Sequence, residues 1–352
     1  MYRRLIRPVL FLVSPERIHH LLVRSLKILF KIHLIYPLIK NCCTIRDERL
    51  KTEFLGLTFD SPVGLAAGFD KNAEVFNEFH AFGFSFIEVG TVTPLGQPGN
   101  PRPRSFRIPA DRGLINRMGF NNKGAASALR NLSGKRRSGL IIGGNIGKNT
   151  ATSNEDAVAD YEACFRELYD VVDYFVVNVS CPNISDLHKL QDQDALEAIL
   201  SRILDVRSEM KVKRPVLLKI SPDLNKKQLD ETLKIISELG IDGIVATNTT
   251  VSREGLVTDP ERIRGIGQGG LSGAPITTRS LEMVGYIAEK TSGNLPIIGV
   301  GGIMSVQDAL NMLDAGATLV QVYTGFIYEG PGLAKRINKA VLSRQSSPEN
   351  LP

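Results

Sequence analysis

The segment VDYFVVNVS at residues 172–180 is the stretch that decides the fold. It is short and rich in valine and aromatic residues, with an unbroken apolar run at residues 174–177, which is typical of a strand buried on both faces of a parallel sheet. Seven more runs of this kind occur along the chain, at residues 62–67, 84–90, 139–146, 215–220, 241–247, 295–300 and 316–323.

Helix-like segments separate these runs. In 154–170 the apolar residues keep helical spacing behind Asn154 as a cap, and 305–315 opens with a capping-box pattern and is closed by Gly316. Eight strands that alternate with helices predict an α/β fold of the TIM-barrel type, because eight parallel strands close into a (β/α)8 barrel. A doubly wound open sheet is the alternative, but no predicted strand is followed by the glycine pattern GxGxxG of dinucleotide-binding folds.

The organisation of the chain follows from this pattern. We expect an N-terminal helical segment at 1–45, a barrel at 46–345 and a disordered tail at 346–352. Two long insertions, 92–120 and 250–277, are rich in glycine, the first also in proline, and are expected to be loops at the mouth of the barrel.

Charge is distributed unevenly over the 352 residues. The chain has 43 basic and 37 acidic side chains, a net charge of +6, yet residues 1–40 alone carry a net charge of +7. The rest of the chain therefore sums to −1, which argues against a nucleic-acid-binding role. No uncharged run of 18 apolar residues occurs, so no membrane-spanning helix is predicted. The four cysteines form no CxxC pair and no metal-ligand spacing, so we expect a reducing compartment and neither a metal nor an iron–sulfur site.

Two amphipathic helices are expected in the N-terminal segment. Ser14-Pro15-Glu16 is a typical helix start, and after it apolar residues recur at three- and four-residue intervals opposite a mostly basic face. A shorter apolar stretch, 5–13, precedes this helix. Helices of this kind bind the surface of an anionic membrane without crossing it. A transit peptide and a helix pair packed on the barrel are the alternatives.

Each predicted strand ends in a small or polar residue. The C-terminal ends of barrel strands carry the catalytic residues in enzymes of this fold, so eight such ends in eight strands predict an active site there. The residues, in chain order, are Gly68, Thr91, Asn145, Asn178, Lys219, Thr247, Gly301 and Tyr323.

The residue types indicate the ligand. Glycines late in the chain, with Gly270 and Gly273 among them, allow the backbone to approach a phosphate closely. Asn145 and Asn178 can donate and accept hydrogen bonds at the edge of a planar heterocycle. A buried Lys219 needs an anion or an electron-rich ring beside it to keep its charge. Together these features predict a site for flavin mononucleotide rather than for a dinucleotide.

Cys181, in the motif NVSCPN, is the candidate proton acceptor. A free cysteine has a pKa of about 8.5, which a nearby cation such as Lys71 or Lys219 would lower into the working range. An inert buried thiol is the alternative. The other cysteines have no predicted role: we expect a core position for Cys164 and a connecting stretch for Cys42 and Cys43.

Nine motifs resemble, in the same order, those of the dihydroorotate dehydrogenase family. They are GLAAGFDK (64–71), IEVGTVTP (87–94), INRMGFNN (115–122), NIGKN (145–149), NVSCPN (178–183), ATNTT (246–250), GGLSG (269–273), GVGGI (299–303) and VYTGF (322–326). The N-terminal segment resembles that of the class 2, quinone-reducing, membrane-associated members. The resemblance implies oxidation of (S)-dihydroorotate to orotate in de novo pyrimidine (UMP) biosynthesis, with one FMN per subunit passing electrons to ubiquinone or menaquinone.

The resemblance also implies the residues of the site. FMN would contact Ala67, Gly68, Lys71, Thr91, Asn145, Asn178, Lys219, Thr247, Gly273, Gly302, Tyr323 and Thr324. The substrate would contact Lys71, Asn116, Arg117, Met118, Gly119, Phe120, Asn178, Asn183, Asn248 and Thr249. Cys181 would be the catalytic base, and Arg107 would face the quinone channel. An anionic carboxylate with two amide-like edges calls for a lysine and several asparagines, as this set provides.

One position departs from the class 2 pattern. Those members usually have serine as the base where this chain has Cys181, and cysteine resembles the soluble class 1 pattern. A soluble oxidase that uses fumarate or another small acceptor is therefore one alternative, and a non-catalytic barrel held at the membrane as a scaffold or sensor is another. Class 2 is preferred because the soluble enzymes lack the N-terminal helices. We expect a monomer without a nucleic-acid partner, bound peripherally to the cytoplasmic face of a bacterial inner membrane.

Overall fold

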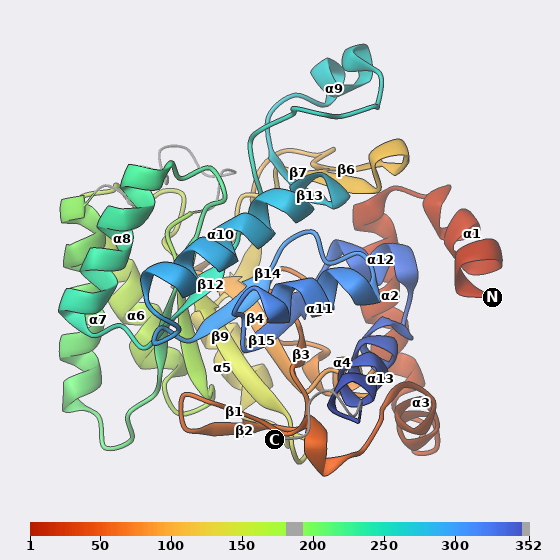
Figure 1. Cartoon of the computed structure of the whole chain (residues 1–352), viewed down its shortest axis with the longest axis horizontal. Coiled ribbons are helices and arrows are strands. Elements are labelled where there is room, and N and C mark those ends of the chain that lie inside the picture. Colours follow the sequence, from red (N-terminus) through yellow and green to blue (C-terminus); the bar gives the residue numbers. More distant parts are fainter. Residues whose placement is uncertain (181–192, 347–352) are drawn as a thin grey trace.

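A closed barrel of eight parallel strands forms the centre of the protein (Figure 1). The computed structural model describes residues 1–180 and 193–346. The ring closes where the last strand pairs with the first, with Val320 opposite Val63. All eight predicted runs are confirmed as barrel strands. They are β3 (Val63–Leu65), β4 (Phe86–Val92), β9 (Ile141–Ile146), β10 (Tyr174–Asn178), β11 (Val216–Ile220), β12 (Gly243–Ala246), β14 (Ile297–Val300) and β15 (Leu319–Val322).

The N-terminal end of the barrel is closed by apolar side chains. Successive side chains of a strand point to opposite sides, so Phe86 of β4 joins the cluster inside the barrel while Ile87 packs against the helices outside. Below the barrel, β1 (Thr52–Phe54) and β2 (Leu57–Phe59) form a hairpin, and the ring of Phe59 lies 5.2 Å from that of Phe86. The polar groups of the interior therefore collect toward the other end.

Helices cover the outer face of the barrel (Figure 1). The predicted helix at 154–170 corresponds to α6 and begins after Asp156 rather than Asn154. The predicted helix at 305–315 corresponds to α11, where the Ser305 hydroxyl accepts a hydrogen bond from the backbone N–H of Asp308. The helices are α4 (Phe76–His80), α5 (Ala125–Leu132), α6 (Ala157–Leu168), α7 (Gln193–Glu209), α8 (Lys226–Leu239), α10 (Thr277–Lys290), α11 (Val306–Asp314), α12 (Thr324–Glu329) and α13 (Leu333–Gln345).

The prediction that the two insertions are loops was wrong. They pair with each other in a three-stranded antiparallel sheet at the C-terminal end of the barrel, and a small apolar core supports it: Ile108, Ile115, Ile266 and Leu271. Prolines and glycines lie mainly in the turns between these strands. Because these residues dominate the local composition, the sequence suggests loops and gives no sign that the strands pair. The elements are β5 (Leu95–Gln97), β6 (Ser105–Ile108), β7 (Gly113–Asn116), β8 (Asn122–Gly124), β13 (Gly270–Gly273) and α9 (Pro260–Ile266), the last protruding from the barrel (Figure 1).

The N-terminal segment lies against one side of the barrel. It consists of a π-helical turn, η1 (Tyr2–Ile6), followed by α1 (Arg7–Phe11), α2 (Pro15–Leu29) and α3 (Ile35–Cys43). The two expected helices are present, whereas α3 was not predicted. Cys42 and Cys43 form its last residues, so their assignment to a connecting stretch was wrong.

Ion pairs fix this segment to the barrel. Glu16 of α2 pairs with Arg104 at 2.7 Å, and Lys27 pairs with Glu74 at 2.8 Å. Arg3 pairs with Glu329 at the end of α12. The side chain of Glu16 is only 11% exposed, so its pair with Arg104 is better shielded from solvent than an ordinary surface pair.

Candidate active site

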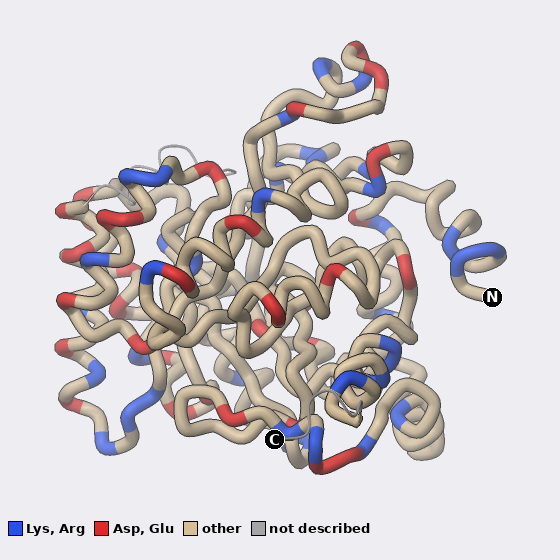
Figure 2. The backbone as a smooth tube through the Cα atoms, in the orientation of Figure 1, with Lys and Arg blue, Asp and Glu red and all other residues tan. Residues whose placement is uncertain are grey.

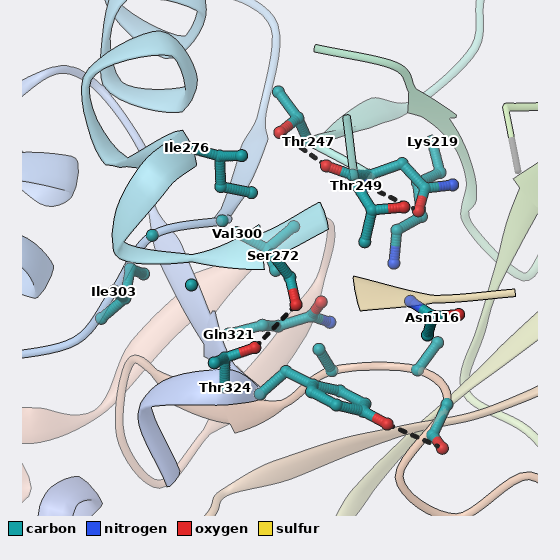
Figure 3. A pocket seen from close by; sticks show the side chains of 18 of the residues that line it. Asn116, Lys219, Thr247, Thr249, Ser272, Ile276, Val300, Ile303, Gln321 and Thr324 are labelled. Atoms are coloured by element: carbon teal, nitrogen blue, oxygen red, sulfur yellow. Dashed lines mark hydrogen bonds between the residues drawn. The ribbon is translucent and has the colours of Figure 1, made fainter. Parts of the chain in front are cut away.

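A cavity opens at the C-terminal ends of the barrel strands. Figure 3 shows Lys219 and Thr249 on one side of the cavity and Ser272 and Thr324 on the other. The strand ends therefore converge on one space, as the sequence predicted.

Most of the residues predicted for the cofactor line this cavity. They are Ala67, Gly68, Lys71, Thr91, Asn178, Lys219, Thr247, Gly273, Gly302, Tyr323 and Thr324. Asn145 is fully buried behind them and contacts the cavity only through Thr91 and Asn178.

Most of the residues predicted for the substrate line the same cavity. They are Lys71, Asn116, Met118, Gly119, Phe120, Asn178, Asn248 and Thr249. Arg117 is not among them, because its guanidinium lies 4.8 Å from the ring centre of Phe106 and donates to the carbonyls of Pro103 and Ile266. Cys181 and Asn183 lie outside the described residues.

A chain of amides runs beneath the cavity. Asn248 Nδ2 donates to Asn178 Oδ1 at 3.2 Å, and Asn178 Nδ2 donates to Thr91 Oγ1 at 3.0 Å and to Asn145 Oδ1 at 3.2 Å. Thr91 Oγ1 in turn donates to Asn145 Oδ1 at 2.5 Å. The chain ends where Asn145 Nδ2 donates to Glu88 Oε1 at 2.7 Å. These contacts hold the amides at the cavity edge in one orientation.

Glu88 and Gln321 are site residues that the sequence analysis missed. Lys219 Nζ lies 3.2 Å from Glu88 Oε1, and Gln321 Nε2 donates to Glu88 Oε2 at 2.7 Å. Both residues stand inside predicted apolar strands, at 84–90 and 316–323. An acid in the middle of a buried strand was the available signal, since such a group is rarely buried without a partner.

Glycines let the backbone line the opposite side of the cavity. Gly273, Gly301 and Gly302 have φ angles of +99°, +114° and +73°, which L side chains rarely adopt. A Cβ atom on Gly302 would stand 2.2 Å from Thr277 Cα, and one on Gly273 would stand 2.4 Å from the Arg112 carbonyl oxygen. Backbone without side chains, beside the hydroxyls of Ser272 and Thr324, fits the phosphate end of a mononucleotide.

This geometry predicts a large effect of adding one methyl group. Gly302→Ala should lower the free energy of unfolding by about 1–3 kcal/mol through overpacking, and it should weaken FMN binding. Chemical denaturation and flavin titration measure the two effects. Gly285→Ala is the matched control, because that glycine lies in α10 with open space around its Cβ position and an ordinary φ. Equal effects of the two substitutions would contradict the prediction.

Two buried ionisable groups shape the loop that follows β3. Burial raises the pKa of Tyr323 to about 12, so its hydroxyl remains a neutral hydrogen-bond donor. Burial also raises the pKa of Asp70 to about 6, although the backbone N–H groups of Glu74 and Val75 donate to its carboxylate and oppose the shift. Asp70 thereby holds the turn that carries Lys71 to the cavity.

A second hollow lies between α2 and the barrel. It shares lining residues with the main cavity, namely Gly68, Lys71, Asn116, Met118 and Tyr323. His19 of α2 lines it with its ring 5.6 Å from that of Phe69. Burial, with a smaller contribution from Lys71, lowers the pKa of His19 to about 4, so the imidazole is neutral at physiological pH.

Arg107 is not a lining residue of this second hollow, but it lies next to two residues that are. It pairs across the sheet with Leu114 and follows Ser105 by two residues on β6, and both of these residues line the hollow. Its guanidinium donates to the Val13 carbonyl at 2.6 Å and lies 4.4 Å from the ring centre of Phe11. Arg107 thus connects the N-terminal segment to the sheet that contains β6.

Comparison with known proteins gives consistent results. A sequence model described as dihydroorotate dehydrogenase matches residues 49–344. The chain is 49% identical to the "Dihydroorotate dehydrogenase (quinone)" of Christiangramia forsetii, over 98% of this chain and 99% of that protein. It is 45% identical to the protein of the same name from Chloroflexus aurantiacus, over 97% and 96%.

Solved structures resemble the chain in the same way. A crystal structure of DHODH from Eimeria tenella in complex with ferulenol has a TM-score of 0.79 and 35% identity, and the match covers 85% of each chain. The ligand-free form from the same organism has a TM-score of 0.80 and 34% identity, over 89% of this chain and 94% of that one.

Proposed function

The chain belongs to the dihydroorotate dehydrogenase family, and from that premise we propose that FMN is its flavin and Cys181 its catalytic base. The protein is a quinone-dependent oxidoreductase that converts dihydroorotate to orotate. The observation that supports FMN is the convergence of nearly all predicted flavin and substrate residues on one cavity, whereas Cys181 is proposed from its place in the NVSCPN motif. The relatives' names favour a quinone over fumarate as the acceptor, and an enzyme over a scaffold.

FMN would be held at two ends of the cavity. Lys219 and Asn178 would meet the edge of the ring, with Asn145 holding the Asn178 amide from behind, while Gly273 and Gly302 would admit the phosphate. The donor set fits because it offers amides, an ammonium group and bare backbone in one space. When bound, FMN supplies the hydride acceptor and the carrier of electrons to the quinone.

The protein's own residues would bind the substrate and move its proton. The Lys71 ammonium would hold the carboxylate, and Asn116, Asn178 and Asn248 would match the amide-like edges of the ring. The Cys181 thiolate would remove the proton from C5 of dihydroorotate. The Tyr323 side chain and the backbone of the β3 loop would help to exclude water from this space.

The purified protein offers a direct test of this function. Dihydroorotate added without oxygen should bleach the yellow absorbance of the holoenzyme, and a ubiquinone or menaquinone analogue added afterwards should restore it. A protein that is colourless and cannot be reconstituted with FMN would contradict the proposal. Recolouring by fumarate but not by quinone would contradict the choice of acceptor.

The N-terminal segment is the proposed membrane contact. Most exposed large apolar side chains among residues 1–180 and 193–346 lie in it: Met1, Leu5, Ile6, Val9, Leu12, Val13, Leu21, Ile28, Leu29, Ile32, Leu34 and Leu38. Figure 2 shows basic residues, in blue, close to the N-terminus. Apolar and basic groups together suit an anionic surface such as the cytoplasmic leaflet, so we propose peripheral binding to that face of a bacterial inner membrane. None of the described helices is long and apolar enough to span a bilayer.

Removing apolar contacts from this segment should release the protein from membranes. Leu5, Val9 and Leu12 are 65%, 63% and 85% exposed, so the triple serine variant should fold normally. It should bind anionic phospholipid vesicles at least tenfold more weakly, since each loses roughly 1–2 kcal/mol of apolar burial. Cosedimentation measures this loss. A double serine variant of Leu95 and Val212, which are exposed elsewhere, is the control and should bind as the unmodified protein does.

The acceptor would reach the flavin through the hollow between α2 and the barrel. Arg107 stands beside Ser105 and Leu114, which line it, and its guanidinium could meet the polar head of a quinone. The hollow adjoins the main cavity, with which it shares lining residues such as Lys71 and Tyr323. None of the proposed contacts to flavin, substrate or acceptor requires a residue from a second copy of the chain, and we propose a monomer.

A further inference from the structure

Glu88 is the most deeply buried charged group in the described part of the barrel. It stands in the middle of β4 with 0% of its surface exposed, two residues after the apolar Phe86. Three donors from three other strands contact it: Asn145 of β9, Lys219 of β11 and Gln321 of β15. A carboxylate only accepts hydrogen bonds, whereas a protonated acid would have to donate one. The contacts therefore fit an ionised Glu88 balanced by Lys219.

The direction of the amide chain follows from this anion. Asn145 must turn its Nδ2 toward Glu88, so its Oδ1 faces Thr91 and Asn178. Asn178 then has its Nδ2 committed and presents its Oδ1 to Asn248. Each amide orients the next, and the acceptor-only carboxylate orients the first. A residue that no ligand touches thus determines which atoms the asparagines show to the cavity.

The same carboxylate sets the charge beneath the cavity. The Lys219 ammonium lines the cavity with 7% of its side chain exposed, and Glu88 lies 3.2 Å from it. The pair sums to zero charge. The neutral Glu88–Lys219 pair stabilises an anionic, reduced flavin ring less than an unpaired Lys219 ammonium would, because opposite charges attract strongly at buried sites.

We propose that Glu88 is a positioning residue that fixes the amide chain Asn145–Asn178–Asn248 and, through Lys219, sets the balance between oxidised and reduced flavin. This inference rests on the proposed FMN site. It assigns to Glu88 no contact with flavin or substrate, and it predicts that two measurable properties, the flavin potential and orotate affinity, change together when the carboxylate is removed.

Glu88→Gln tests the proposal with almost no change in volume. The variant should bind reduced flavin at least tenfold more tightly relative to oxidised flavin, which raises the two-electron midpoint potential by about 30 mV or more. Because a glutamine can also donate, the amide chain should lose its single direction, and orotate should bind about tenfold more weakly. Glu88→Asp, which retains the charge, should keep the potential closer to that of the unmodified protein.

Asp173→Asn is the matched control. Asp173 is also a buried acid, 7% exposed and paired with Arg136, but it lies just before β10, at the closed end of the barrel. Its substitution should lower stability without moving the flavin potential. A Glu88→Gln protein in which either the flavin potential or the orotate affinity is unchanged would overturn the proposal, as would an equal shift of the potential in the control.

Unfolding of the flavin-free protein provides a second test. In the Glu88→Gln and Lys219→Met single variants, one charge of the pair remains buried without its partner, whereas the double variant removes both. The double variant should therefore lose much less stability than the sum of the losses of the two single variants. If a single variant fails to fold and the double variant folds, that result also supports the pairing. Additive losses would overturn it. An unmodified protein that binds no FMN would contradict the proposed function. The stabilities of these three variants would still decide whether Glu88 and Lys219 stabilise the fold as a pair.

Discussion

Replacing Cys181 with alanine should slow the anaerobic reduction of the flavin by dihydroorotate by about 10²–10⁴-fold, the usual contribution of a general base. Binding of FMN and of orotate should change little, because the proposed contacts to both ligands come from other side chains. Stopped-flow bleaching of the flavin absorbance measures the rate, and titration measures the affinities. A rate close to that of the unmodified protein would remove Cys181 from this role.

Two further substitutions make this test specific. Cys181→Ser should keep part of the rate with its pH optimum moved upward, because a hydroxyl is a weaker acid than a thiol and loses its proton less readily. An unchanged pH profile would count against a thiolate base. Cys164→Ala is the control, since that thiol is fully buried on α6 and burial raises its pKa well above the ordinary value. Its removal should leave flavin reduction unaffected.

The barrel could be predicted because its signals are local. Each strand is a short apolar run that is buried at nearly every position, as in Phe175–Val177, and each is followed by a helix with its own periodicity. The polar strand ends are also adjacent to these runs in sequence. Local patterns are sufficient when neighbouring strands follow one another around the ring, as here.

The sheet at the mouth could not be predicted in this way. Strand β13 pairs with β7, and the paired residues Leu271 and Ile115 are more than 150 positions apart in the chain. Both strands are only four residues long and glycine-rich, so neither has a clear strand pattern by itself. Helix α3, which was not predicted either, is nine residues long and carries Pro37 in its first turn, where proline is tolerated.

The residues of the candidate site also divide into those that the local sequence could predict and those that it could not. Residues at strand ends were found because position alone indicates that they face the cavity, as for Lys219 and Thr247. Glu88 was missed because its role depends on partners from three other strands. Arg117 follows Asn116 directly in a predicted motif, yet its side chain leaves the cavity for the neighbourhood of Phe106. A motif identifies a segment, whereas the backbone decides which of its side chains face the ligand.

A bulky side chain at His19 should separate the two halves of the reaction. His19 lines the hollow between α2 and the barrel at the point nearest Phe69, and its imidazole is neutral because burial lowers its pKa to about 4. His19→Trp would therefore add volume without removing a charge. Because the added indole would occupy the space proposed for the acceptor, quinone reduction should slow about 10–100-fold, which is equivalent to about 1.4–2.8 kcal/mol. Bleaching of the flavin by dihydroorotate should proceed at nearly the normal rate.

The same substitution one residue later is the control for this prediction. His20 also borders the hollow, but its side chain is 59% exposed, so the indole of His20→Trp can turn toward solvent. Quinone reduction by that variant should stay within about threefold of normal, a change of less than 1 kcal/mol. If His19→Trp slows both half-reactions equally, the hollow is not a separate acceptor route. If it slows neither, the quinone reaches the flavin from another side of the barrel, and the N-terminal segment serves only to hold the protein on the membrane.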